Sequence, residues 1–275
     1  MAISAQDVKR LREATGVGMM DCKKALTEAD GDFDAAIDLL RKKGQKVAAG
    51  RADRDATEGV IATAVSADGT TGVIAEVNSE TDFVARNSDF TTFAQTVADR
   101  ILEERPDSDE ALRAMDVDGQ PLGDALTTMT GKIGEKIDVR RFEILTTDGG
   151  QIVEYIHPGA KLGVLVEMTG TGDLTEAGRD VAMQAAAMNP VAATRADVPQ
   201  ETQDKEFEIG REQARAEGKP EAILDKIAEG RLRKFFEENV LVEQPFVKDS
   251  SMTVSKMLDG LGAELKRFVR FGLGG

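Results

Sequence analysis

The chain has 275 residues, enough to bury a full core and to divide into two or three domains. Its 35 Lys and Arg face 50 Asp and Glu, a net charge of −15, which argues against a protein that binds nucleic acid over its whole surface, because such binding depends on neutralising phosphates. The single cysteine, Cys22, excludes an internal disulfide. The sequence has no apolar stretch of roughly 18 residues and no signal-peptide core, so we expect a soluble, cytoplasmic protein.

Residues 4–43 predict three short helices with tight turns, a minimal helical bundle. Ser4 and Asp32 are suited to begin helices, and Gly16 is suited to end one. Met19 and Met20 stand where the first two helices meet. Adjacent helical residues cannot share one face, so we expect one methionine in the small core and the other pointing outward, where methionine adapts well to a partner surface. The charged, Gly/Ala-rich stretch 42–59 is typical of a linker.

A strand–turn–strand–helix pattern then occurs twice. In the first copy, strands at 60–65 and 73–77 flank an Asp-Gly turn, and a helix with Ser88 as its N-cap carries apolar residues at helical spacing up to Ile101. In the second copy, strands at 152–156 and 164–168 precede a helix ending near Met188. The repetition predicts two similar α+β core subdomains, each with helices against one face of a sheet.

The two copies differ in the loop between strand and helix. The first copy has "NSETDFVARN", and the second has "TGTGDLTEAG", which contains no aromatic residue. A loop that only joins two elements does not need Phe83, so this side chain could enter a partner. The alternative, that Phe83 packs under its own helix, stays open at this point.

The remaining segments complete an α+β fold. A helix at 122–133 and a strand from Ile137 lie between the copies. The charged stretch 198–241, broken at Gly218 and Pro220, predicts two antiparallel helices that form a projecting arm. Its expected apolar seam consists of Phe207, Ile223, Ile227 and Phe235. The predicted domains are a helical bundle with its linker (1–54), a first core subdomain (55–146) and a second (147–275), with a coiled-coil insertion at about 190–240.

Catalytic chemistry has little support. His157 and Cys22 are the only residues of their kinds and lie far apart in the sequence, and no phosphate loop, zinc motif or nucleophile elbow occurs. His157 opens a turn and is expected to be exposed. This lack of motifs argues against enzyme activity, a cofactor and a metal site without excluding them, and a carboxylate-based metalloenzyme stays a remote alternative.

Five stretches resemble successive motifs of bacterial translation elongation factor Ts: "TGVGMMDCKKALTEADGD", "EVNSETDFVARN", "KIGEKIDVRR", "HPGAKLGVLVE" and "EGRLRKFFEENVLVEQPFV". They occur in order from about residue 2 to 271. The resemblance implies a guanine-nucleotide exchange factor that binds elongation factor Tu in its GDP-bound and nucleotide-free states. It also implies that the N-terminal bundle is ubiquitin-associated-like and that the arm is a coiled coil. It implies no direct nucleic-acid or membrane contact.

The resemblance also implies roles for single residues. The stretch Thr81, Asp82, Phe83 and Val84 matches the family segment that disturbs the partner's Mg²⁺ site. Other implied partner contacts are Lys9, Arg12, Met19, Met20, Ile133, His157 and Val247.

Two departures from the family affect these expectations. Lys248 replaces a methionine of some relatives, which puts that contact in doubt, and a C-terminal helical module of many relatives has no counterpart here. Beside the metalloenzyme, an adaptor that binds another protein without exchange activity stays open as an alternative. The arm could form a homodimer of two copies or contact the partner.

Overall fold

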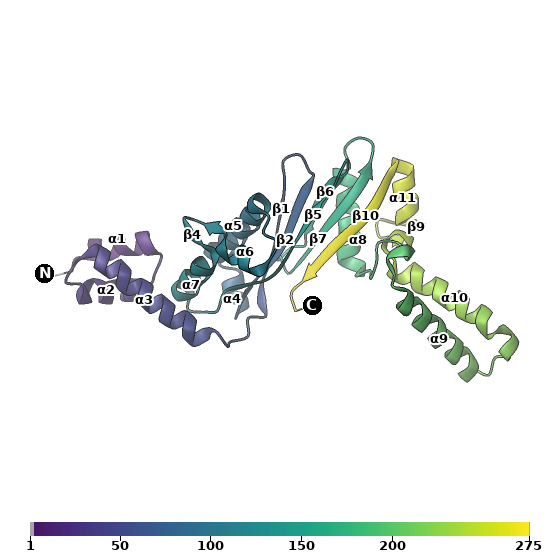
Figure 1. The fold of residues 1–275 in the computed structure, drawn as a ribbon, viewed down its shortest axis with the longest axis horizontal. Helices are drawn as coiled ribbons and strands as arrows, with labels where there is room; N and C mark the ends of the chain where they lie inside the picture. Colours follow the sequence, from purple (N-terminus) through teal and green to yellow (C-terminus); the bar gives the residue numbers. More distant parts are fainter. Residues whose placement is uncertain (1–2, 275) are drawn as a thin grey trace. The chain divides into compact units, whose positions relative to one another are not determined.

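The computed structural model describes residues 3–274 (Figure 1), and segments of the chain alternate in sequence between two compact units. The first unit comprises the chain through Ala62, the segment Ala75–Phe142 and the residues from Gly272 onward. The second comprises Thr63–Ile74 and Glu143–Phe271. The fold is mixed α+β and begins with helices, as the sequence predicts.

Three helices open the first unit: α1 (Ala5–Thr15), α2 (Met19–Glu28) and α3 (Phe33–Arg51). The Ser4 side chain accepts a hydrogen bond from the Asp7 N–H, and Gly16 ends α1 in the left-handed conformation, φ 66°. The small core between the helices contains Val8, Leu11, Cys22, Ala25, Leu26, Ala36 and Leu40.

The predicted linker is partly wrong, because α3 continues to Arg51 instead of ending near residue 44. Tertiary packing explains the difference. Gly44 of α3 lies against Gly131 of α7 (Leu122–Ile133), so close that a Cβ atom added to Gly131 would be 2.4 Å from the Gly44 Cα atom. Glycine is a poor helix former, but here it permits two helix backbones to approach each other.

The first sheet has the strand order β1–β2–β5, formed by β1 (Glu58–Val65), β2 (Thr71–Ser79) and β5 (Asp138–Thr146). β2 is central and is buried along its whole length. The predicted hairpin is confirmed, with Gly69 at φ 70° in the turn.

Three helices follow β2: α4 (Asp82–Ala85), α5 (Ser88–Glu104) and α6 (Asp109–Ala114). The N-cap of α5 is Asn87 rather than the predicted Ser88, because the Asn87 side chain accepts the Asp89 N–H. The two-residue strands β3 (Asp116–Val117) and β4 (Gln120–Pro121) pair with each other.

The second unit contains a sheet of order β10–β7–β6, formed by β6 (Gln151–Ile156), β7 (Leu162–Gly170) and β10 (Ala263–Gly272). β6 and β7 are antiparallel, with Val153 opposite Val166. α8 (Thr175–Met188) packs across both strands, and at Gly178 an added Cβ atom would be 2.5 Å from a Val153 methyl carbon. The strand–strand–helix order predicted for both copies is therefore observed.

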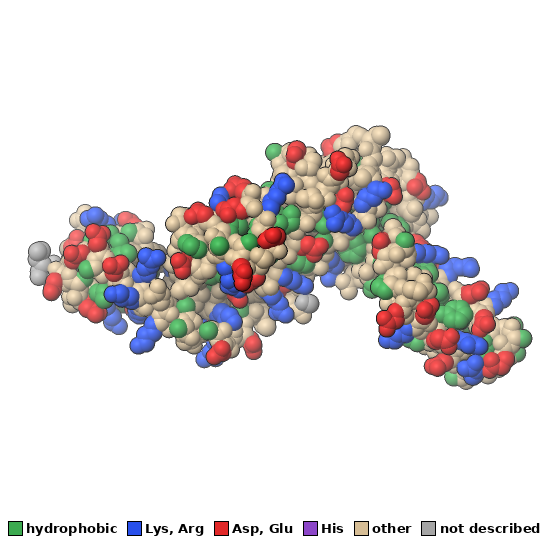
Figure 2. Space-filling model, viewed as in Figure 1, with side chains coloured by type: hydrophobic (Ala, Val, Ile, Leu, Met, Phe, Trp, Pro, Cys, Tyr) green, Lys and Arg blue, Asp and Glu red, His purple; other side chains and the backbone are tan. Residues whose placement is uncertain are grey.

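A helical hairpin, α9 (Gln200–Ala216) and α10 (Glu221–Asn239), follows a short 3₁₀ turn at Arg195–Asp197. The two helices lie side by side (Figure 1), and acidic and basic side chains mix over their surface (Figure 2). The predicted seam is partly wrong: Phe207, Ile227 and Phe235 are half-buried, but Ile223 is 41% exposed. The fully buried positions are Gly210, Ala214, Leu224, Ala228 and Phe236. Small residues on the contact face allow the two helices to pack closely. The seam therefore could not be predicted from the positions of large apolar residues alone. A 3₁₀ turn (Leu241–Glu243), β8 (Pro245–Phe246), β9 (Asp249–Thr253) and α11 (Val254–Leu261) lead into β10.

Candidate functional site

The most exposed large apolar side chain that the described residues include lies in the loop after β2. The Phe83 side chain is 82% exposed, which decides against the alternative that it packs under its own helix. It belongs to the 81–84 segment, meaning Thr81, Asp82, Phe83 and Val84, which forms the start of the four-residue helix α4. Thr81 is the N-cap, and its hydroxyl accepts the Val84 N–H at 3.5 Å. An exposed aromatic ring on a loop is the kind of feature that contacts a partner.

Two glutamates hold this segment in place. Glu135, in the turn between α7 and β5, accepts the Thr81 N–H at 3.0 Å and the Thr81 hydroxyl at 2.8 Å. Glu80 accepts two bonds from the Arg51 guanidinium, at 2.8 and 2.7 Å, and the Lys136 N–H at 2.7 Å. The segment is therefore fixed from α3 on one side and from the end of α7 on the other.

The charges around the segment follow from these contacts. Burial raises the pKa of Glu80, but hydrogen bonds from the Lys136 N–H and from Arg51 outweigh it, so the net pKa lies below the usual value. Glu80 is thus a stable anion at neutral pH. The Asp82 carboxylate is paired with Arg86, one helical turn further on, and the Arg86 side chain is 74% exposed. Ion pairs this exposed are worth at most about 1 kcal/mol, so Asp82 can exchange Arg86 for other partners at little cost.

The predicted contact residues of the N-terminal helices lie at the surface. Lys9 and Arg12 are exposed on α1, where Lys9 pairs with Glu13 at 3.6 Å. Met19 is 41% exposed and Met20 65% exposed. The expectation that one of the two methionines fills the core is wrong, because Cys22, Ala25 and Leu26 of α2 occupy that core instead. Both thioether side chains are available to a partner.

Ile133, the last residue of α7, borders a hollow of about 460 Å³ within the first unit. Val17, Ile37, Leu40 and Val47 contribute apolar surface to this hollow, and the ion pair of Lys43 with Asp21, 2.6 Å long, lies at its wall. Ile133 thus stands beside the junction of α3 and α7.

His157 and Val247 lie in the second unit. His157 is exposed just after β6, as the turn predicted, and its Nδ1 atom lies 3.0 Å from the Tyr155 hydroxyl. Val247 is 49% exposed. The neighbouring Lys248 donates to Asp180 of α8 at 2.5 Å, so its ammonium group is directed at the protein's own helix.

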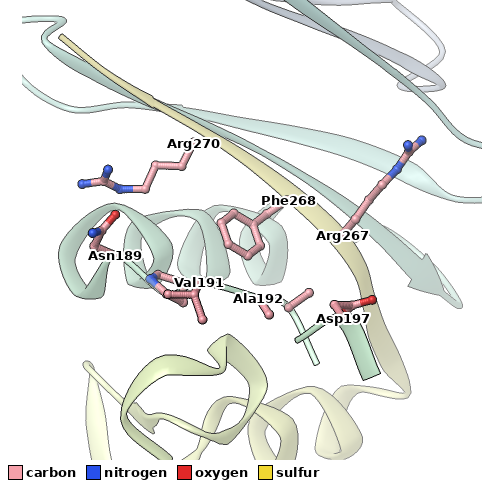
Figure 3. A pocket seen from close by; sticks show the side chains of 9 residues that line it. Asn189, Val191, Ala192, Asp197, Arg267, Phe268 and Arg270 are labelled. Atoms are coloured by element: carbon pink, nitrogen blue, oxygen red, sulfur yellow. The ribbon is translucent and has the colours of Figure 1, made fainter. Parts of the chain in front are cut away.

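A second hollow, of about 440 Å³, contains none of the predicted residues (Figure 3). Phe268, Val191 and Ala192 line its middle, and Arg270 and Asn189 lie at one side. The Arg270 Nε atom is buried and has no hydrogen-bond partner among residues 3–274, while its Nη2 atom donates to the Ala186 carbonyl at 3.4 Å. Burial lowers the pKa of Arg270. The carbonyl is among the last of α8, so Arg270 acts at least as a cap for that helix.

Within residues 3–274 no group of three or more histidine, cysteine, aspartate or glutamate side chains is arranged to hold a metal ion. In the same part of the chain, every helix is too short or too polar to span a bilayer.

Comparison with known proteins shows the family of the chain. A family model described as "Elongation factor TS" matches residues 80–275. The chain belongs to the elongation factor Ts family. Elongation factor Ts of Prosthecochloris aestuarii is 50% identical to it, with 99% of each chain covered. The protein of the same name from Cytophaga hutchinsonii is 49% identical over 98% of this chain and 99% of its own. That from Alkalilimnicola ehrlichii is 51% identical over all of this chain and 93% of its own.

Sequence reasoning missed Glu80 and Glu135 as parts of the site. Both stand inside stretches that resemble motifs of the elongation factor Ts family, "EVNSETDFVARN" and "KIGEKIDVRR". The motifs contain the two residues, but the hydrogen bonds they make, from Thr81 to Glu135 across 54 positions and from Arg51 to Glu80 across 29, are visible only in the fold.

Proposed function

We propose that this protein is the guanine-nucleotide exchange factor of translation elongation: it binds GDP-bound elongation factor Tu, promotes GDP release and holds the nucleotide-free state. Membership of the elongation factor Ts family supports the proposal. The observation that carries it is the Phe83 side chain, 82% exposed beside the Asp82 carboxylate on a segment fixed by hydrogen bonds. The role places the protein in the cytoplasm, without direct nucleic-acid contact.

The mechanism follows from how nucleoside diphosphates are held. Tight binding depends on Mg²⁺ and protein groups that neutralise the phosphate oxygens. The Phe83 ring enters the partner near these groups and displaces the partner residues that hold the Mg²⁺ ion. Asp82 leaves Arg86 and competes for hydrogen bonds of the same groups. No bond of the nucleotide is broken, so the protein is an exchange factor rather than an enzyme acting on GDP.

Thermodynamic linkage sets the limits of this mechanism. The factor promotes release only by binding the nucleotide-free partner more tightly than the GDP-bound one, and GDP must then weaken the factor's binding to the same degree. Each 1.4 kcal/mol removed from the barrier speeds release about tenfold.

The other surface residues supply affinity. In the first unit these are Lys9, Arg12, Met19, Met20 and Ile133, and in the second His157 and Val247. In this proposal α1–α3 form a ubiquitin-associated-like bundle, and α9 and α10 form the coiled-coil insertion. Pairing of two copies through that insertion stays a prediction. Lys248 contributes little, since its ammonium group is already bound to Asp180.

The test is release of fluorescent GDP from purified elongation factor Tu after mixing with this chain. The proposal predicts release that rises with factor concentration and reaches a maximum. Binding to elongation factor Tu with GDP release at the spontaneous rate would contradict it and would favour the adaptor alternative. The double variant Met19→Ala/Met20→Ala should raise the concentration for half-maximal release and leave the maximal rate nearly unchanged, because both side chains contribute affinity.

A further inference from the structure

The 81–84 segment cannot hold its own conformation. α4 has four residues, fewer than an isolated helix needs to be stable. The Phe83 side chain is 82% exposed, so it gives the segment almost no packing against its own subunit. Ordering a loop costs conformational entropy, and this cost must be offset by contacts from elsewhere in the chain.

Glu135 makes those contacts with the segment itself. Its two carboxylate oxygens are both used, one for the Thr81 N–H at 3.0 Å and the other for the Thr81 hydroxyl at 2.8 Å. Because that hydroxyl donates its proton to Glu135, its lone pair is left to accept the Val84 N–H, which lies 3.5 Å away. One carboxylate thus fixes both the first backbone amide of the segment and the orientation of its N-cap side chain.

The backbone places Glu135 for this contact. α7 ends at Ile133, and its C-cap Gly134, with a φ of 85°, reverses the chain direction just before Glu135. The next residue, Lys136, donates its N–H to Glu80 at 2.7 Å and its ammonium group to the carbonyls of Ala52 and Arg54, at 2.8 and 3.1 Å. Glu135 therefore binds the start of the segment, and the adjacent Lys136 binds the chain just after α3.

We propose that Glu135 is a positioning residue for nucleotide exchange, which holds the 81–84 segment so that Asp82 and Phe83 enter the partner already in place. This inference rests on the proposed function. A segment that is already ordered in the free factor loses no further conformational entropy in the release step. Glu135 does not touch the nucleotide site and acts only through Thr81.

The variant Glu135→Ala should therefore lower the maximal rate of GDP release about tenfold, equivalent to about 1.4 kcal/mol, with little change in the half-saturating concentration. Glu135→Gln keeps an acceptor oxygen and should recover part of the rate. Glu110→Ala, which removes an exposed glutamate of α6, is the matched control and should behave as wild type.

A double-mutant cycle with Thr81→Ala tests whether Glu135 acts through Thr81. If it does, the double variant is no slower than the slower single variant. Hydrogen exchange of the free factor gives a second readout: the Thr81 and Val84 amides should exchange faster in Glu135→Ala, while amides of β2 keep their protection.

Additive losses in the cycle, or a wild-type maximal rate for Glu135→Ala, would overturn the positioning role while leaving the proposed function intact. A change in half-saturation alone would also overturn it, because it would make Glu135 a source of affinity. If wild-type factor itself failed to accelerate GDP release, the proposed function would fall, and this role with it.

Discussion

The contact of α3 with α7 is expected to tolerate alanine at one of its two glycines and not at the other. At Gly131 an added Cβ atom would lie 2.4 Å from the Gly44 Cα atom and 3.1 Å from its carbonyl carbon. Both are backbone atoms that cannot rotate away, so Gly131→Ala must push the helices apart. Overpacking of this kind costs about 1–3 kcal/mol. At Gly44 an added Cβ atom would lie 3.5 Å from the Gly131 Cα atom, an ordinary contact.

Helix propensity favours alanine by about 1 kcal/mol at both positions, so comparing the free energies of unfolding of the two variants isolates the cost of overpacking. Chemical denaturation measures this free energy for the protein, to which both helices contribute. We expect Gly131→Ala to be about 1–3 kcal/mol less stable than Gly44→Ala. Equal stability of the two variants would refute the close approach of the helices.

Two further predictions concern ion pairs of glutamates. Glu76 is fully buried and accepts the Arg141 Nε–H at 2.8 Å. Arg141→Ala should lower the free energy of unfolding by about 3 kcal/mol, because it leaves a buried carboxylate without its cation. Chemical denaturation measures this loss, and a value below about 1 kcal/mol would contradict the prediction. The depressed pKa of Glu80 means that its ion pair with Arg51 stabilises the fold above the ordinary glutamate pKa of about 4.5. This contribution is lost as the pH falls through the lower folded-state pKa. In an NMR titration the shift of the Lys136 amide should therefore have its midpoint below pH 4.5, and a midpoint above that pH would be inconsistent with the account.

Local patterns were enough to predict most elements of the fold. Alternating apolar residues around Asp68–Gly69 predicted the β1–β2 hairpin, and the spacing of Phe90, Phe93 and Val97 predicted α5. Two of the errors occurred where distant residues decide the structure. α3 extends past Gly44 because α7 packs against it, and the α9–α10 seam passes through Ala214 and Ala228, whose small side chains give a weak hydrophobic signal.

The candidate site was predictable only in part. Phe83 was a candidate because an aromatic residue is unusual in a polar loop, but the sequence could not decide whether its ring is exposed or buried. The partners of the segment are far away in the chain: Glu135 is 54 positions from Thr81, and Arg51 is 29 positions from Glu80. Hydrogen bonds over such separations have no local pattern, so the reason for the fixed conformation appears only in the folded chain.

The central claim is that Asp82 and Phe83 drive nucleotide release instead of holding the partner. Stopped-flow release of fluorescent GDP from elongation factor Tu, at saturating factor, tests it with the variant Asp82→Ala/Phe83→Ala. Leu261→Ala, which removes another exposed apolar side chain, 55% exposed, is the control. The account predicts that the double variant keeps the thermal stability of the wild type and loses at least tenfold in maximal rate, the equivalent of about 1.4 kcal/mol, while Leu261→Ala matches wild type. A double variant that reaches the wild-type maximal rate would contradict the account.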